Sequence, residues 1–246
     1  MAHLITRRRA LVTTAAGMAA AAAPFGFAGG QQKTPVGMQL VLAADTSLSV
    51  VEERYRMQMD GYLEAFQSNK LLQAIRGLEP PSLAVMFVTW GTKPRVLVPW
   101  TLLSGKASVA AFCGHFAAQA ASRPSSGIYT RIDNLMRFCI TQFDQEYIGG
   151  RRVLDVSGDG GNSGGPASHA GLKRAKDALV ASGVTINGLP ILVVPPAFIS
   201  PAQPPEGLDV YYREHVVGGV GRFMISSQGF EDFPRAILAK LVAEIA

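Results

Sequence analysis

Continuous apolar runs and helix-like patterns alternate along this chain. The apolar runs cover residues 36–44, 82–90, 151–156 and 183–194. Runs of this length, bounded by small polar residues, are typical of strands that are buried on both faces of a parallel sheet. The first run (VGMQLVLAA) leads directly into Asp45, so we expect this carboxylate at the carboxyl end of its strand.

Apolar residues spaced three and four apart predict the helices between these strands. The segment 50–76 shows the pattern best, and its apolar face consists of Tyr55, Met59, Tyr62, Leu63 and Phe66. The other predicted helices cover residues 106–121, 130–147, 168–182, 209–215 and 230–245. Strands that alternate with helices in this way indicate an α/β protein with a parallel sheet.

The second strand is followed by a short turn rather than by a helix. Residues 91–94 (GTKP) connect it to a strand at 95–100, and so short a connection suggests an antiparallel hairpin. Pro99 favours an edge position for the added strand, since proline cannot donate a hydrogen bond within a central ladder. A last strand is expected near 222–225. The predicted fold is a doubly wound, mostly parallel central sheet with one antiparallel edge strand and helices on both faces, in a single domain over residues 36–246.

The chain begins with a stretch that reads as an export signal. Residues 1–28 contain three arginines, an alanine-rich apolar stretch and a small-residue end, without any acidic side chain. Arg8 and Arg9 followed by Ala10 resemble the twin-arginine signal that bacteria use to export folded proteins. An uncleaved anchor is disfavoured because the apolar stretch is marginal for spanning a bilayer. We expect a periplasmic or secreted protein without stable membrane insertion after signal removal, and a linker at 29–35.

Composition and charge narrow the classes of partner. The chain is 48% hydrophobic and 17% charged, which is enough apolar material for a core and is unlike a disordered chain. The formal net charge is +5 at pH 7, but three of these charges are the arginines of the expected signal, which leaves about +2 for the rest. The charge therefore gives no support for binding to nucleic acid.

The two cysteines leave two interpretations open. Cys113 and Cys139 could form a disulfide in an oxidising compartment. Both also lie on apolar faces of predicted helices, beside Phe112 and Phe138, so two buried free thiols fit at least as well. Their spacing does not match that of a zinc site.

Three oxygen-bearing side chains follow the first strand at every second position: Asp45, Ser47 and Ser49. Open α/β sheets bind their ligands at the carboxyl ends of strands, and hard divalent cations prefer oxygen ligands. The alternative is that Ser49 only caps the following helix, with Glu52 completing a capping box. That alternative accounts for Ser49 but not for Ser47.

Two later loops carry further oxygen ligands at the same side of the predicted sheet. Thr130 precedes a predicted helix, and Asp159 stands in Ser157-Gly158-Asp159-Gly160 after a strand. With the first loop, this order resembles the von Willebrand factor type A (vWA) domain, a Rossmann-like fold. Its metal-ion-dependent adhesion site is built from Asp-x-Ser-x-Ser, a distant Thr and a later Asp-Gly. The segments LVLAADTSLSV, VLDVSGDGGN, GVTINGLPI and FPRAILAKLVAEI resemble an exported bacterial branch of that family with no assigned function.

The resemblance, which covers about residues 36–246, implies a role for each of five side chains. Ser47 and Ser49 would bind Mg²⁺ or Mn²⁺ through their hydroxyls, and Thr130 would bind directly or through water. Asp45 and Asp159 would hold coordinated waters. A cation with neutral hydroxyl ligands attracts an incoming carboxylate. The expected function is therefore non-catalytic binding of a protein or peptide that carries an acidic side chain.

Three other functions compete with this interpretation. Residues 161–166 (GNSGGP) resemble the nucleophile loop of trypsin-like serine proteases, with Ser163 as nucleophile. That family is an all-β double barrel, and the only nearby upstream histidine, His115, stands in a predicted helix. A metal-dependent hydrolase would also need a general base, and none stands out near Asp45. Finally, an assembly factor could keep the metal site only as a vestige.

Four further polar or aromatic positions have plain structural interpretations. Asp155 lies inside a strand and is expected to be a buried, hydrogen-bonded carboxylate rather than a partner of the metal site. Asn162 is expected to be a turn residue. Trp90 and Trp100 close neighbouring strands, where packing is the usual role of aromatic side chains.

Overall fold

The structure, a computed structural model, describes residues 32–193 and 203–246. The expected export signal at 1–28 lies outside the described residues, as does most of the proline-rich stretch that follows the strand at 183–194. Residues 33–246 belong to one compact unit. No helix among the described residues is long and apolar enough to cross a membrane.

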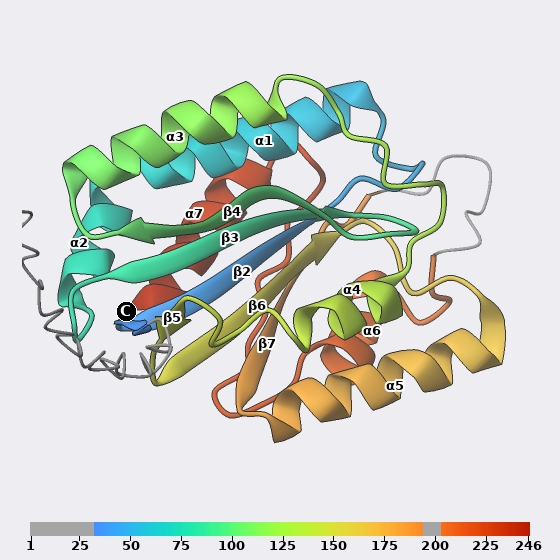
Figure 1. The fold of residues 1–246 in the computed structure, drawn as a ribbon. Coiled ribbons are helices and arrows are strands. Elements are labelled where there is room, and N and C mark those ends of the chain that lie inside the picture. Colours follow the sequence, from blue (N-terminus) through green and yellow to red (C-terminus); the bar gives the residue numbers. More distant parts are fainter. Residues whose placement is uncertain (1–31, 194–202) are drawn as a thin grey trace, which may run out of the picture. The chain divides into compact units, whose positions relative to one another are not determined.

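A five-stranded sheet forms the centre of this unit (Figure 1). Its strands are β2 (Met38–Asp45), β3 (Leu83–Trp90), β4 (Arg95–Leu103), β6 (Arg151–Gly158) and β7 (Val184–Pro190). They lie in the order β4-β3-β2-β6-β7, and only β4 is antiparallel to its neighbour. The predicted fold class, including the antiparallel edge strand, is confirmed.

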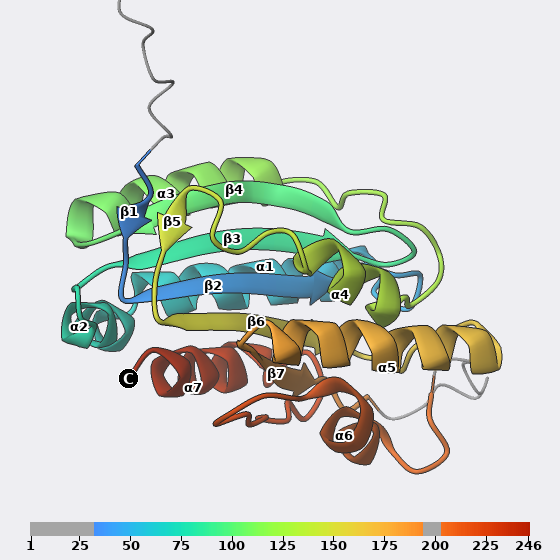
Figure 2. The same cartoon turned by 60° about the horizontal axis from the view of Figure 1, so that its bottom comes forward.

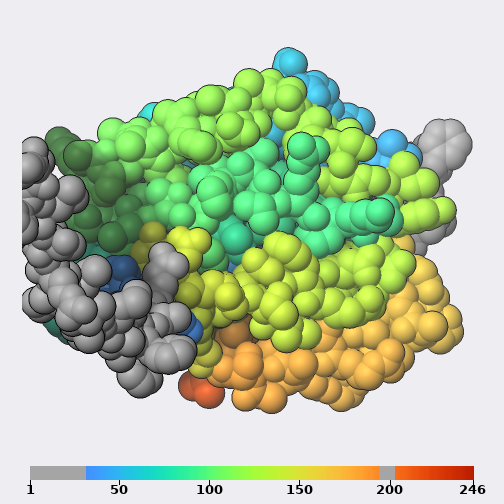
Figure 3. Space-filling view, in the orientation of Figure 1, coloured from blue at the N-terminus to red at the C-terminus, as the bar shows by residue number. Residues whose placement is uncertain are grey.

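Strand β2 shows why the sheet forms as it does. Every one of its residues is buried, and alternate side chains belong to different cores. Leu40 and Leu42 pack into one hydrophobic cluster, while Val41 and Ala43 pack into the other. A strand that is apolar on both faces can only be satisfied between two layers of helices. The space-filling view shows how little of this blue strand reaches the surface (Figure 3).

The helices form two groups around the sheet. The first hydrophobic cluster contains α1 (Glu52–Gln67), α2 (Asn69–Gly77), α3 (Lys106–Ala120) and α7 (Phe233–Ile245). The second contains α4 (Ile132–Cys139), α5 (Gly165–Ala181), α6 (Leu208–Tyr211) and the π-helix η1 (Tyr212–Val216). Figure 2 shows α4 and α5 in front of the sheet and α1 behind it. This is the doubly wound arrangement that the sequence predicts.

The predicted helix at 50–76 is in fact two helices, α1 and α2. They meet at Ser68, whose backbone is extended and whose hydroxyl accepts a hydrogen bond from the Lys70 N–H at 3.2 Å. This is the geometry of a serine N-cap. The apolar pattern conceals the break because Leu71 and Ile75 of α2 are buried in the same core.

Two other predictions of local structure are wrong. The helix expected at 130–147 covers only Ile132–Cys139; residues 140–144 form turns, and Asp144 adopts a φ of 57°, in the left-handed region. The strand expected near 222–225 makes only isolated bridges, such as Met224 with Gly188, since Gly219 and Gly221 adopt positive φ just before it.

The expected linker at 29–35 is partly structured. Thr34 and Pro35 form the short strand β1, which pairs in parallel with β5 (Tyr147–Ile148). This two-stranded ladder holds the beginning of the described chain next to the strand that leads into β6. Both cysteines are buried free thiols, which is one of the two states expected from the sequence.

The strand order fixes where a ligand site is expected. The chain leaves β2 toward β3 on one side and later returns to β6 on the other side of β2. The carboxyl ends of β2 and β6 therefore border a topological switch point, where open α/β sheets leave a crevice. Asp45 ends β2, and Asp159 directly follows β6.

Candidate metal site

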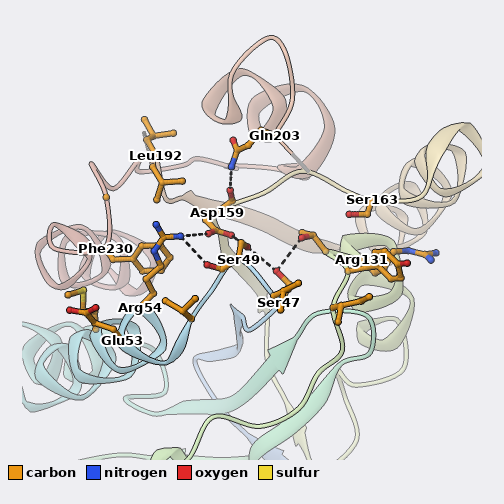
Figure 4. Close-up of a pocket in the computed structure, with 18 of the residues that line it drawn as sticks. Ser47, Ser49, Glu53, Arg54, Arg131, Asp159, Ser163, Leu192, Gln203 and Phe230 are labelled. Carbon is orange, nitrogen blue, oxygen red and sulfur yellow. Dashed lines mark hydrogen bonds and ion pairs between the residues drawn. The ribbon is translucent and has the colours of Figure 1, made fainter. Parts of the chain in front are cut away.

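The structure brings together the five side chains that the sequence singles out. They come from three loops: Asp45, Ser47 and Ser49 after β2, Thr130 before α4, and Asp159 after β6. Four direct hydrogen bonds connect them into one cluster. Figure 4 shows Ser47, Ser49 and Asp159 converging on the same point.

The loop after β2 is held in place by groups from distant parts of the chain. The Ser47 N–H donates to Asp45 Oδ1 at 2.7 Å, which turns the backbone back toward the strand end. Arg123 donates to the carbonyls of Thr46 and Ser47, each at 2.7 Å, and Gln58 donates to that of Asp45 at 3.1 Å. The hydroxyls of the loop are therefore positioned before any ligand arrives.

The hydroxyl oxygens have the spacing that a small divalent cation requires. Ser47 Oγ lies 3.3 Å from Ser49 Oγ and accepts a hydrogen bond from Thr130 Oγ1 at 3.2 Å. Neighbouring ligands of an octahedral Mg²⁺ lie about 3 Å apart, because each is about 2.1 Å from the ion. Two neutral oxygens at nearly this spacing from Ser47 Oγ, with two carboxylates beside them, fit Mg²⁺ or Mn²⁺.

Asp159 joins the loop after β6 to the loop after β2. Ser49 Oγ donates to Asp159 Oδ1 at 2.7 Å, and Arg54 Nη1 lies 3.6 Å from Asp159 Oδ2. Arg54 also donates to the Ser49 carbonyl at 3.0 Å and lies over the ring of Phe230 (Figure 4). The alternative in which Ser49 only caps α1 is wrong, since that helix is capped at Val51 without a side-chain hydrogen bond.

Burial makes the two carboxylates unstable as anions. Asp45 is fully buried, and burial, together with the nearby Asp159 carboxylate, raises the pKa of Asp45 to about 8. Burial also raises the pKa of Asp159, although Ser49 and Arg54 partly oppose this. Asp45 Oδ2 and Asp159 Oδ2 are buried oxygens without a hydrogen-bond partner among the described residues. A bound dication would relieve both of these costs.

The arginines set the charge of the site. Arg123 and Arg54 each bring one positive charge close to one of the two carboxylates, so the four side chains together are formally neutral. A divalent cation added to this group would leave it with a net charge of about +2. Such a site favours an anionic ligand as the next occupant.

Thr130 and Asp159 are kept in register by the glycine loop between β6 and α5. The Ser163 N–H donates to the Thr130 carbonyl at 2.7 Å. Asn162 accepts a hydrogen bond from the Asp133 N–H at 3.1 Å and donates to Ser168 Oγ at 2.7 Å. Asn162, expected to be only a turn residue, therefore ties the start of α4 to the start of α5.

Ser163 lacks the partners of a catalytic serine. Among the described residues, no histidine forms a hydrogen bond with its hydroxyl. His169 Nε2 lies 2.9 Å from the Asn162 carbonyl oxygen instead, and His115 is exposed on α3. The serine-hydrolase alternative therefore gains no support from the geometry of this loop.

An open cavity of about 1520 Å³ lies against the candidate site. Ser47, Ser49, Thr130 and Asp159 all contribute to its wall, whereas Asp45 lies buried beneath them. The cavity therefore gives an external group access to the hydroxyls and to Asp159.

The other polar and aromatic positions have structural roles. The Asp155 carboxylate is buried, as expected, and pairs with Lys240 Nζ at 2.6 Å, but neither of its oxygens accepts a hydrogen bond from the described residues. Trp90 is fully buried in the second hydrophobic cluster. Trp100 packs at the edge of that cluster and donates from Nε1 to the Gln142 carbonyl at 3.1 Å.

Sequence reasoning did not find Arg54 and Arg123, and it gave Asn162 as a turn residue without its role in joining α4 to α5. Arg54 and Arg123 stand in a helix and a loop with ordinary surface patterns, and only the tertiary fold brings them to the site. Asn162 gives a weak signal, because asparagine after glycines is typical of any turn. The described residues contain no group of three or more His, Cys, Asp or Glu side chains suited to a metal.

A family model described as "Protein of unknown function (DUF1194)" matches residues 35–246. A search of curated proteins found no match. The match to the family model covers every loop of the candidate site.

Solved structures with a similar fold include proteins from animals and bacteria. Proximal thread matrix protein 1 from the mussel byssus, in a structure with a zinc-occupied MIDAS motif, aligns with a TM-score of 0.57 at 15% identity. The alignment covers 86% of this chain and 48% of the mussel protein. The pilus adhesin SpaC from Lactobacillus rhamnosus GG, in its open conformation, aligns with a TM-score of 0.57 at 14% identity, over 87% of this chain and 30% of the adhesin.

The conserved hypothetical protein BatB from Bacteroides thetaiotaomicron differs from these two in length. It aligns with a TM-score of 0.51 at 15% identity, over 85% of this chain and 98% of its own. This chain thus spans less than half of the mussel protein but has the extent of BatB. At these identities the similarity shows a vWA-like fold.

Proposed function

We propose that this chain, which belongs to the DUF1194 family, is a non-catalytic binding protein that captures an acidic group of a protein or peptide through a bound divalent cation. The observation that carries the proposal is the cluster of three hydroxyls at the mouth of a cavity, in which Ser47 Oγ lies 3.3 Å from Ser49 Oγ and 3.2 Å from Thr130 Oγ1. The similarity to a mussel protein with a zinc-occupied MIDAS motif and to a pilus adhesin supports it.

The residues present fit Mg²⁺ or Mn²⁺. Ser47, Ser49 and Thr130 would supply neutral oxygens, and Asp45 and Asp159 would supply the negative charge next to them. When bound, the cation supplies a positive charge that attracts an anionic oxygen. The chain itself positions the hydroxyls, through the hydrogen bonds of Arg123 and Gln58 to the loop backbone.

A carboxylate is the ligand that this charge arrangement favours. The two arginines already balance the two acidic side chains, so the bound cation leaves an excess of positive charge for the ligand to neutralise. A hard anionic oxygen also suits a hard cation. Asp and Glu side chains are the commonest groups of this kind on proteins and peptides.

Selection from a displayed library of random linear peptides tests the proposal. The immobilised protein is panned in Mg²⁺, and bound phage are eluted with EDTA. We expect enrichment of peptides that contain Asp or Glu, and loss of this enrichment when EDTA is present throughout. The Ser49→Ala variant should select nothing above background.

A matched control is Ser182→Ala, which removes a hydroxyl at the end of α5 that donates to the local Leu179 carbonyl. This variant should select the same peptides as the unaltered protein. Peptides that bind equally well in EDTA would contradict the metal-bridged mechanism and would favour the assembly-factor alternative.

We further propose that the protein acts outside the cytoplasm. The proposal rests on the Arg8-Arg9 pair and the alanine-rich stretch in residues 1–28. Expression of the full chain in a bacterium with a functional twin-arginine system should give a shortened product in the periplasmic fraction. Replacement of both arginines by lysine should leave the precursor in the cytoplasm, and unchanged export would contradict the twin-arginine route.

A further inference from the structure

Large apolar side chains gather on the surface around the candidate metal site. The exposed large hydrophobic residues of the described chain are Leu48, Val51, Val96, Ile128, Tyr129, Ile140, Ile148 and Val220. Half of them, namely Leu48, Val51, Ile128 and Tyr129, line the one cavity against the site. We call these four residues the apolar ledge. Monomeric proteins keep such clusters small, and a cluster next to a cavity marks a surface that binds something apolar.

The ledge is built into the same loops that carry the proposed metal ligands. Leu48 stands between Ser47 and Ser49 and is 65% exposed, whereas Ser47 is 1% exposed. Tyr129 directly precedes Thr130 and is 55% exposed, whereas Thr130 is 3% exposed. In both loops the polar side chain turns inward and its apolar neighbour turns out toward the cavity.

Hydrogen bonds hold this outward orientation. The Leu48 N–H donates to the Ile128 carbonyl at 3.4 Å and so joins the two loops. The Tyr129 N–H donates to Thr92 Oγ1 at 3.0 Å. Gly127 has a φ of 88°, and a Cβ there would lie 2.5 Å from the Thr92 Cβ, so the turn before the ledge requires glycine. The apolar side chains are therefore fixed in place on a supported backbone.

The charged side chains at the cavity restrict what else the partner can carry. Arg131 donates from Nε and Nη2 to the two carboxylate oxygens of Asp133, each at 2.8 Å. Arg54 pairs with the Asp159 carboxylate and donates to the Ser49 carbonyl. Glu53 and Glu231 also line the cavity and are exposed (Figure 4 labels Glu53). Additional acidic groups on a ligand would meet these carboxylates and be repelled.

We infer that the ligand is a peptide segment in which a single acidic side chain is flanked by large apolar side chains. The inference rests on the proposed function, since the acidic side chain is the one that the cation holds. The apolar neighbours then lie on the ledge formed by Leu48, Val51, Ile128 and Tyr129. A strongly acidic segment, which would suit the cation alone, binds less well.

Peptides from the library selection in Mg²⁺ test this directly. We expect Leu, Ile, Phe, Tyr or Trp to be enriched next to the acidic residue. One selected peptide is then synthesised with two altered versions, in which either the apolar flanks become Ser or the acid becomes its amide. Loss of one or two buried apolar side chains should weaken binding by about ten- to a hundredfold.

Variants of the ledge give the complementary measurement. The double variant Leu48→Ser, Tyr129→Ser should bind the parent peptide about tenfold or more weakly. It should also lose the preference for the parent peptide over the Ser-flanked peptide. Val220→Ser is the matched control, because Val220 is 95% exposed and does not line the cavity. An unchanged Mg²⁺-induced rise of the melting temperature verifies that the ledge variant is folded and still binds the cation.

The outcomes separate the two proposals. If the Ser-flanked peptide binds as tightly as its parent, and both depend on Mg²⁺ and on the acid, the ledge inference is overturned and the proposed function stands. Full binding of the parent peptide by the ledge variant also overturns it. If no peptide binds in a way that depends on Mg²⁺, the proposed function fails and the ledge inference fails with it.

Discussion

Two pairs of buried acidic side chains lie along and beside β6, and the protein neutralises them differently. Asp155 and Glu244 both contact the ammonium of Lys240, so the chain supplies its own cation, and all three residues are buried. Asp45 and Asp159 face hydroxyls, and Asp159 borders an open cavity. The first pair is neutralised within the chain, and we propose that the second pair takes a cation from outside.

The difference also concerns what surrounds each pair. Asn187 donates to Glu244 Oε1 at 3.0 Å, and Arg151 bonds to the last carbonyls of α7, so that the Lys240 cluster fastens this helix to the sheet. At the other pair, the arginines mainly bond to backbone carbonyls of the Ser47 loop. The side-chain oxygens of that loop are left available.

The largest predicted effect concerns Asp155 and Glu244, which we call the closed pair because Lys240 neutralises them within the chain. Lys240→Met removes the ammonium that pairs with two buried carboxylates, and we expect the free energy of unfolding to fall by about 3–5 kcal/mol. Urea denaturation measures this. The control Lys173→Met removes an exposed partner of Asp177 and should change stability by less than about 1 kcal/mol. If Lys240→Met is as stable as its control, the ammonium does not hold this helix.

The stability of the protein should instead respond to added Mg²⁺ through Asp45 and Asp159, which we call the open pair. Saturation at about 100 times the dissociation constant should stabilise the protein by about 2.7 kcal/mol, because only the folded state forms the site. The variant Asp45→Asn should lose this response but remain at least as stable without the metal, since it buries an amide in place of a carboxylate. Thermal unfolding with and without Mg²⁺ checks both statements.

Asp232→Asn is the control for that experiment. Asp232 interacts with Arg235 and the Gln228 N–H, away from the cluster of hydroxyls, so this variant should keep the full response to Mg²⁺. A response that survives in Asp45→Asn would place the cation elsewhere on the molecule.

A smaller effect concerns the pH dependence of the closed pair. Burial, together with Asp155, raises the pKa of Glu244 from 4.5 to about 7. The folded state therefore keeps a proton that the unfolded state releases, so the stabilisation is complete below pH 4.5 and is lost as the pH rises through about 7. In Glu244→Gln the amide oxygen can still accept from Lys240 and Asn187. This variant should match the unaltered protein at low pH and exceed its stability at high pH.

Denaturant unfolding of both proteins at several pH values gives a difference curve for Glu244 and the groups that interact with it. Titrating groups outside the cluster of Asp155, Lys240 and Glu244, including Asp45, contribute equally to both curves and cancel. A flat difference between low and high pH would show that folding leaves the pKa of Glu244 at its ordinary value.

The smallest effect is expected at Arg54. Removal of its charge in Arg54→Gln should strengthen Mg²⁺ binding by a factor of about five or less, because partly exposed ion pairs contribute about 1 kcal/mol or less. Titration calorimetry measures the change. Arg56→Gln, on the same helix but paired with Glu52 at the surface, should leave the affinity unaltered. Weaker Mg²⁺ binding in Arg54→Gln would mean that Arg54 organises the Ser49 loop rather than competing with the cation.

The sequence predicts the sheet well because its signal is local. A strand such as β2, apolar throughout and followed by Asp45, can only be buried between two layers. The break at Ser68 could not be predicted in the same way, since the apolar pattern continues across it and only the backbone reveals the new cap. The turn after α4 contains Asp144, whose carboxylate accepts a hydrogen bond from Gln39 of β2 at 2.7 Å, a contact across 105 residues that the local pattern does not reveal.

The same distinction applies to the two acidic pairs. Asp45 and Asp159 are recognisable because each directly ends or follows a buried strand, where the chain must expose polar groups. The ion pair between Asp155 and Lys240 joins residues 85 positions apart. The sequence pattern of the helix that carries Lys240 is that of an ordinary amphipathic helix, so it does not reveal the ion pair. Arg123, which is 77 residues from the carbonyl of Thr46, is hidden for the same reason.

Anomalous diffraction from crystals of the protein grown with Mn²⁺ tests the central claim most directly. The account predicts one strong anomalous peak about 2.1–2.2 Å from Ser47 Oγ and Ser49 Oγ, on the side open to the cavity, and none beside Lys240. A peak elsewhere, or none between the three loops at saturating Mn²⁺, would contradict it.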